Sequence, residues 1–224
     1  MKTKIISLQF AYFLKDIVER PDLEFNCLNS EMLNIFDAMP QMIPVPRELP
    51  TDVPLMVLRS SNEQYTCNIS RSRIDFIFNR LDDSKSNNEV LSDFNLKVKG
   101  LTQSILSKQE VNRFGLVARY FHQDNSAVHT LRNRFFSKIV DGAEELSLRF
   151  NKPSDSHGYR INDIVEINAA ELIIDNKATK GILIQRDINN NIKPSSYIEK
   201  SVLSEISTKY AVRVSESAIE GLIK

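Results

Sequence analysis

One stretch near the middle of the sequence decides the fold: residues 113–121 read RFGLVARYF. Successive side chains of a β-strand point to opposite faces of the sheet, so this stretch has two distinct faces. One face is apolar and consists of Phe114, Leu116, Ala118 and Tyr120. The other mixes charged and apolar side chains and consists of Arg113, Val117, Arg119 and Phe121. We therefore predict a strand over residues 110–122, with its apolar face covered by helices and its arginine face uncovered.

Similar patterns on both sides of this strand predict the rest of the fold. Alternating apolar residues predict strands over residues 3–13, 55–79, 144–151, 159–175 and 180–188. Helical spacing predicts helices over residues 28–39, 89–108 and 126–140, and a C-terminal helix that starts at a capping box of Ser196 and Glu199. Strands that come in runs favour an α+β fold with a mainly antiparallel sheet and helices on one face.

The order of these elements repeats along the chain. A strand, a helix, a run of strands and a second helix occur over residues 1–108 and again over residues 109–224, without residue-level identity between the halves. We expect a single α+β domain over residues 1–224, with two pseudo-repeated strand-helix-strand-strand-helix halves as its possible architecture.

The composition is that of an ordinary globular protein. Hydrophobic residues make up 42% of the chain, and 29 basic residues balance 29 acidic ones, so no overall field draws it to nucleic acid or membranes. A core of this size needs no disulfide, and we predict that Cys27 and Cys67 are both buried thiols. The N-terminal alternation indicates a strand rather than a secretion signal, and no apolar run is long enough to span a membrane. We expect a cytoplasmic protein without membrane contact.

Five prolines crowd into one short segment: Pro40, Pro44, Pro46, Pro50 and Pro54. Their fixed φ angles and missing N–H donors exclude a helix interior and a central strand. We predict an extended loop that wraps the core and covers Met42, Ile43 and Val45. The alternative is a polyproline II segment that docks a partner.

The sequence has no recognisable catalytic motif. None of its six glycines belongs to a phosphate-binding loop, and no metal-binding Cys/His cluster is present. Acid–base or metal chemistry could be assembled from His122, Asp124 and His129, as in a cryptic hydrolase or nuclease, although residues at such a turn also serve as helix caps. We predict a non-enzymatic protein that needs no cofactor.

The basic segment 108–138 is the most informative region for function. It holds six basic residues against two acidic ones, Glu110 and Asp124. Together with an upstream basic strand, it supplies our candidate binding residues: Arg71, Arg73, Arg113, Arg119, Phe121, Arg132 and Arg134. Such side chains suit a protein interface or stacked nucleic-acid bases. They could instead pair internally with the acidic segment 141–175.

The chain also resembles a sporadically distributed bacterial family of uncharacterised proteins. The resemblance covers residues 55–122: the turn Ser60–Glu63, the strand Tyr65–Ile69, and Arg113-Phe114-Gly115-Leu116 followed by Arg119-Tyr120. Phe121-His122 stands where the family pattern has an asparagine. The resemblance implies a patchily inherited accessory protein and supplies no activity.

These observations lead to one expected function and two alternatives. We expect a protein-binding or assembly module of a bacterial accessory or defence-type system, which self-associates or binds a protein partner. The first alternative is nucleic-acid binding through the arginine face. The second is the cryptic hydrolase.

Overall fold

The computed structural model of the chain describes residues 2–44, 46, 48–174, 177–191 and 197–223. The strand predicted from residues 113–121 is present as β6 (Val111–Gln123) and lies beside β1 (Thr3–Leu14) at the centre of the sheet. The two strands pair antiparallel, with Phe10 opposite Leu116 and Phe13 opposite Arg113. The N-terminal segment is therefore the most central strand of the fold.

The first half of the chain forms an antiparallel meander that returns to β1. Its elements after β1 are α1 (Pro21–Glu24), α2 (Leu28–Glu31), β2 (Gln41–Met42), β3 (Met56–Arg59), β4 (Tyr65–Ile69), β5 (Arg73–Asn79) and α3 (Asn87–Leu106). β5 pairs with β1, and α3 then crosses the sheet. The helix begins at a capping box of Ser86 and Glu89, which satisfies backbone donors at its exposed end.

The second half follows the same plan from β6. Its further elements are α4 (Ala127–Phe135), η1 (Lys138–Val140), β7 (Ser147–Asn151), β8 (Ser154–Ser156), β9 (Tyr159–Ile174), β10 (Lys177–Asn190), α5 (Lys200–Ala211), η2 (Val212–Val214) and α6 (Glu216–Ile223). β10 returns to pair with β6, as β5 returns to β1. The predicted capping box at the C-terminal helix is wrong, because α5 begins at Lys200 with Glu199 itself as the N-cap residue, and Ser196 lies outside the described residues. The C-terminal helical segment breaks at η2 before α6.

The described strands form one ten-stranded sheet of order β2-β3-β4-β5-β1-β6-β10-β9-β7, with β8 paired to β9 beside it. Every pairing in it is antiparallel. The α+β prediction with a mainly antiparallel sheet is therefore confirmed. Each half places its first strand at the centre and its last strand next to the first, so the two halves have related topologies.

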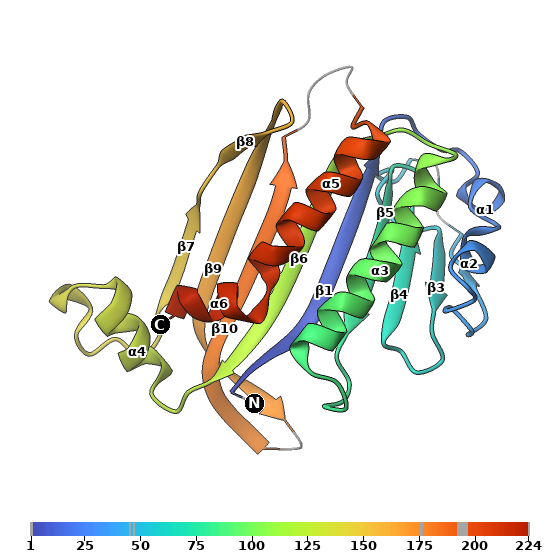
Figure 1. Cartoon of the computed structure of the whole chain (residues 1–224). Helices are drawn as coiled ribbons and strands as arrows, with labels where there is room; N and C mark the ends of the chain where they lie inside the picture. Colours follow the sequence, from blue (N-terminus) through green and yellow to red (C-terminus); the bar gives the residue numbers. More distant parts are fainter. Residues whose placement is uncertain (1, 45, 47, 175–176, 192–196, 224) are drawn as a thin grey trace.

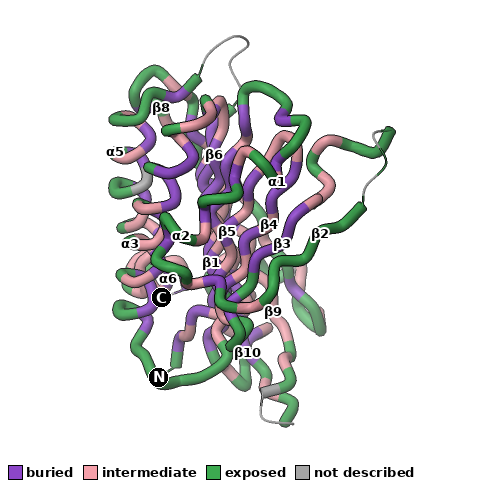
Figure 2. Tube along the Cα trace, turned by 90° about the vertical axis from the view of Figure 1, so that its right-hand side faces the viewer, coloured by how far each residue is buried: buried purple, intermediate pink, exposed green. Residues whose placement is uncertain are grey.

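The helices gather on one side of this sheet (Figure 1). Helices α3, α5 and α6 lie across the same face, and Figure 2 shows this face edge-on, with the helices to one side of the strands. Phe114, Leu116, Ala118 and Tyr120 of β6 are all buried there, as predicted. One continuous cluster of buried apolar side chains runs through both halves.

A buried ion cluster ties the C-terminal helices to the sheet. Asp163 of β9 is only 2% exposed and receives two hydrogen bonds from Arg186 of β10, both 2.7 Å long. Arg213 of η2 donates a third to Asp163, also at 2.7 Å, and its backbone carbonyl accepts from Arg186 at 2.6 Å. Burial acts to raise the pKa of Asp163, but the hydrogen bonds and charges of the two arginines outweigh it and lower the pKa.

The prediction of a helix over residues 28–39 was wrong. The helix stops at Glu31, and Leu33 and Asn34 both take positive φ angles of 56°. The side chain of Asn29 then accepts from the Phe36 N–H and donates to the Phe36 carbonyl. This local pairing closes a loop, so apolar residues at helical spacing pack against the core without a helix.

The structure contradicts two further predictions about which side chains are buried. Cys67 is buried, but Cys27 is exposed, so the two thiols are not a buried pair. The proline-rich loop does not cover its apolar residues, because Met42 is 54% and Ile43 42% exposed. Val45 lies outside the described residues. Among the helices that the structure describes, none is long and apolar enough to span a membrane.

Candidate functional site

The side of the sheet opposite α3, α5 and α6, which we call the open face, carries the candidate site. Strand register shows which side chains share it, because residues paired across neighbouring strands point to the same face. Most of them are half-buried, in contrast to the fully buried residues beneath the helices. On the central strands they are Gln9, Ala11, Phe13, Arg73, Asp75, Ile77, Arg113, Gly115, Val117, Arg119, Leu183, Gln185, Asp187 and Asn189.

Arg73 and Arg113 come together on this face around one aromatic ring. Phe13 of β1 lies between them, because its register partners are Arg73 on β5 and Arg113 on β6. The guanidinium carbon of each arginine lies 4.7 Å from the centroid of the Phe13 ring. Cation–π contacts contribute about 0.5–1 kcal/mol each at exposed sites. We call these three side chains the guanidinium stack.

Phe13 was not among the candidates that we identified from the sequence. The available signal was its parity: it lies on the face of β1 opposite to Tyr12, on a strand whose other face is apolar. Its two arginine neighbours could not be identified, because they are far from it in the sequence.

Most other polar groups of the open face are held by their neighbours. Asp75 accepts hydrogen bonds from Arg73 at 2.7 Å and from Gln9 at 2.8 Å. Arg119 donates to Gln185 at 2.7 Å and to the Ser7 hydroxyl at 3.4 Å. The bond of Gln9 joins β1 to β5, and the bonds of Arg119 join β6 to β10 and to β1, so these side chains are held across the four central strands.

A network of asparagines continues this pattern onto β7 and β9. Asn162 receives a hydrogen bond from Asn151 and donates to Asn189 and Asn191. Asn189 in turn donates to Asp187 at 2.9 Å. On β9 and β10 the open face is therefore rich in amides, with the carboxylates of Asp187 and Glu166 among them.

The remaining candidate arginines do not lie on the open face. Arg132 lies on α4 and contacts Asp141 at 3.4 Å and His129 at 2.8 Å. Arg134, on the same helix, donates to the carbonyls of Leu222 and Gly221. Arg71 lies in the turn before β5, against the proline-rich loop. The seven predicted binding residues therefore do not form one surface, because α4 packs away from the open face.

Phe121 faces the open side but is only 4% exposed. Its ring lies so close to Gly181 that a Cβ there would overlap it. It contributes to packing and offers little ring surface to a ligand.

The candidate catalytic residues do not converge. The Nδ1 atom of His122, which is buried, lies 2.7 Å from the hydroxyl of Thr3, and this hydroxyl donates to Glu220 at 2.8 Å. Asp124 accepts from the Ser126 N–H and the Thr130 hydroxyl at the start of α4, and these bonds outweigh partial burial and lower its pKa. His129 contacts Arg132 and Asn133 on its own helix. Among the described residues, no three His, Cys, Asp or Glu side chains are grouped to hold a metal ion.

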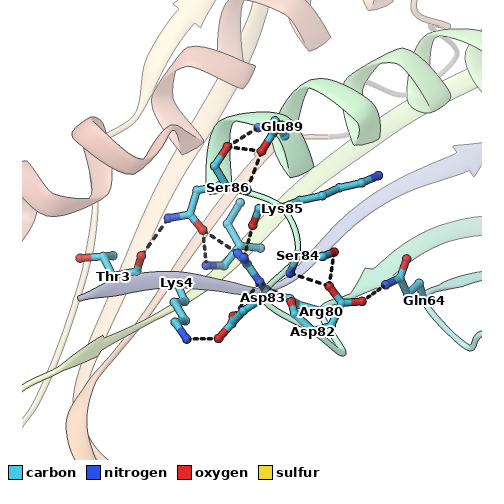
Figure 3. Close-up of polar contacts among 12 residues, drawn as sticks. Thr3, Lys4, Gln64, Arg80, Asp82, Asp83, Ser84, Lys85, Ser86 and Glu89 are labelled. Carbon is cyan, nitrogen blue, oxygen red and sulfur yellow. Dashed lines mark hydrogen bonds and ion pairs between the residues drawn. The ribbon is translucent and has the colours of Figure 1, made fainter. Parts of the chain in front are cut away.

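The guanidinium of Arg80 is bonded to the loop that follows β5 and to the start of α3 (Figure 3). It donates to the carbonyls of Asp82 and Lys85 and to the side chain of Asn87, and Asp83 next to it pairs with Lys4. Asn87 also binds the backbone of β1 at Thr3 and Ile5. This network fastens the start of α3 to the central strand, so it is structural.

Internal neutralisation of the basic segment 108–138 by the acidic segment 141–175 is limited. Within the described part of the chain, the ion pair between Arg132 and Asp141 is the one that joins the two segments. Asp163, the most buried of the acidic residues, is bound instead by Arg186 and Arg213. In the described structure, Arg113 and Arg119 are therefore not paired with carboxylates of the acidic segment.

Comparisons with known proteins do not identify a family. No protein-family model matches the sequence, and no curated protein matches it. A search of solved structures returned one described as Methanococcus jannaschii TBP, with 12% identity over 100% of each chain and a TM-score of 0.24. A likeness at this level carries no inference about fold or function.

Proposed function

We propose that this chain is a non-enzymatic protein-binding module that engages a protein partner, or a second copy of itself, through the open face. The observation that carries the proposal is the half-exposed surface of the central strands. Ile77, Val117 and Leu183 lie there among arginines and amides, and the helices α3, α5 and α6 cover the opposite face (Figure 1). A partner can exclude water from such a surface, and arginine is enriched among residues that dominate interface energies.

Nucleic-acid binding is less well supported by the charge distribution. Asp75, Asp187 and Glu166 lie among the arginines of the open face. A phosphate backbone that crossed this face would pass these carboxylates, and Arg132 and Arg134 lie elsewhere on α4. Nucleic-acid affinity depends on several basic residues that neutralise successive phosphates. The open face suits a partner of mixed charge better.

A hydrolase reading is also less well supported. His122, Asp124 and His129 each bind different groups of the chain itself, and Asp124 accepts hydrogen bonds from the Ser126 N–H and the Thr130 hydroxyl at the start of α4. General acid–base catalysis needs its groups within reach of one substrate atom. His122 instead contacts Thr3, whereas His129 contacts Arg132 and Asn133 on its own helix.

Two matched variants test the proposal. Val117→Lys places a charge at the centre of the open face, and Leu96→Lys makes a similar change on α3, where Leu96 is 70% exposed on the helix side. Sedimentation velocity of the chain alone measures self-association. Affinity capture from the cells that produce the chain, quantified by mass spectrometry, measures binding of another protein. Thermal melts identify any variant that fails to fold.

We expect Val117→Lys to abolish the oligomer or the defined partner of the wild type, and Leu96→Lys to retain it. A monomeric wild type that retains no defined partner would contradict the proposal. Equal losses in both folded variants would also contradict it, because binding would then not depend on the open face.

A further inference from the structure

Arg113 differs from Arg73 and Arg119 of the open face, because no other polar group of the described residues binds its guanidinium. Among the residues that the structure describes, it makes no ion pair and no hydrogen bond, and its recorded contact is with the Phe13 ring. Arg73, on the other side of the ring, is paired with Asp75, and Arg119 is bound by Gln185. The guanidinium stack together with Asp75 therefore carries one net positive charge.

Local backbone geometry sets Arg113 in place. The register between β1 and β6 shifts after Phe13, which pairs with Arg113, because Leu14 pairs with Val111. Asn112 is thus the extra residue of a β-bulge immediately before Arg113. Bulges often redirect a side chain at a functional position, and here the bulge ends the regular pairing at the stack.

Two polar atoms at this bulge lack a hydrogen-bond partner. Oδ1 of Asn112 is a buried acceptor and Nε of Arg113 a buried donor, and neither is bonded within the described chain. Buried polar groups in native proteins nearly always have a partner. A ligand group that accepts hydrogen bonds would supply a partner for the Arg113 guanidinium at this end of the face.

We propose that the guanidinium stack is a carboxylate-binding site, which takes an aspartate, glutamate or C-terminal carboxylate of the partner. This inference rests on the proposed function, since it names the group by which a partner is recognised on the open face. The planar guanidinium presents donors that match the two oxygens of a carboxylate. The Phe13 ring restricts the guanidinium beforehand, so little side-chain freedom is lost on binding.

The charge around the stack selects a single carboxylate over a chain of phosphates. Arg113 supplies one uncompensated charge, whereas Asp75 lies in the next register row on β5 and would repel a continuous polyanion. An acidic peptide can place one carboxylate at Arg113 and neutral groups beside Asp75.

Fluorescence anisotropy with three labelled probes tests this site: an octapeptide of glutamate, an octapeptide of glutamine and an octamer of thymidylate. The proteins are the wild type, Arg113→Gln, Phe13→Leu and Arg59→Gln. Arg59 is an exposed arginine of the same face, on β3, and it is the matched control for loss of one charge.

We expect the glutamate peptide to bind the wild type more tightly than the glutamine peptide. Arg113→Gln should weaken the affinity for the glutamate peptide by about tenfold, as expected when a hydrogen bond to a charged group is lost. Phe13→Leu should lower this affinity by a smaller factor. Arg59→Gln should lower it by less than about threefold, as expected for loss of an exposed charge.

Three outcomes would overturn the inference: no binding of the glutamate peptide, equal losses in Arg113→Gln and Arg59→Gln, or tighter Arg113-dependent binding of the thymidylate octamer. The inference and the proposed function can fail separately. If Val117→Lys abolishes partner binding while Arg113→Gln does not affect it, the carboxylate site is wrong and the open face remains the interface.

Discussion

The two faces of the sheet use the same strands in different ways. On the covered face, Phe76 stacks between Tyr65 and Phe94, with ring centroids 5.6 and 5.4 Å away, and the buried Asp163 is bonded to two arginines. On the open face, arginines lie against a ring and beside amides, and no carboxylate of the described part of the chain pairs with Arg113. Burial on the covered face therefore supplies most of the apolar core, whereas the open face keeps polar groups near the surface.

The largest contrast between the faces should appear at the neighbouring residues Phe76 and Ile77. Phe76 is fully buried against the helices, whereas Ile77 is half-buried on the open face. We expect Phe76→Ala to lower the free energy of unfolding by about 3–5 kcal/mol, through lost burial and a cavity. Ile77→Ala should cost less than half as much. Urea unfolding measures both, and equal losses would show that the open face is packed like a core.

A second pair of substitutions, both on β9, compares a buried carboxylate with a half-exposed one. Asp163→Asn leaves two arginines with a neutral partner and should cost about 3 kcal/mol, the scale for breaking a buried ion pair. Glu166→Gln, on the open face of the same strand, should change stability by less than about 1 kcal/mol. Thermal or urea unfolding at neutral pH measures the difference. A similar small loss in both would mean that the ion cluster does not hold the C-terminal helices.

The comparison of the wild type with Asp163→Asn also predicts how the free energy of unfolding depends on pH. The folded pKa of Asp163 is lowered from 3.8, so its charged form stabilises the fold fully above the unfolded pKa, and this contribution is lost as the pH falls through the folded pKa. The stability gap between wild type and Asp163→Asn should therefore be constant near neutral pH and shrink below about pH 4. Urea unfolding at a series of pH values measures the gap. A gap that widens on acidification would contradict the assigned direction.

The smallest predicted effects separate two glycines of the open face. A Cβ on Gly181 would overlap the Phe121 ring and lie 2.5 Å from the His122 carbonyl oxygen, whereas a Cβ on Gly115 would meet only Ala11, at 3.8 Å. Gly181→Ala should lower the unfolding free energy by about 1–3 kcal/mol through overpacking. Gly115→Ala should be tolerated. If melting temperatures fall equally, the face is more tightly packed at its centre than the contacts indicate.

Local errors in the sequence prediction have an identifiable cause. The segment after α2 has apolar residues at helical spacing, yet the side chain of Asn29 pairs with the backbone of Phe36 and closes a loop. Side-chain bonds like those of Asn29 compete with the helix and are invisible to hydrophobic periodicity. The helix predicted over 126–140 also ends early: α4 stops at Phe135, and a short 3-10 helix follows.

Alternation along residues 113–121 determined on its own which side chains share a face, because the two-residue period of a strand is a local property. It did not determine what stands beside them. Only the tertiary structure placed Phe13 between Arg73 and Arg113 and moved Arg132 and Arg134 to α4, since strand order and register join residues far apart in the chain. Such pairings depend on how the whole sheet closes, and no local pattern contains that information.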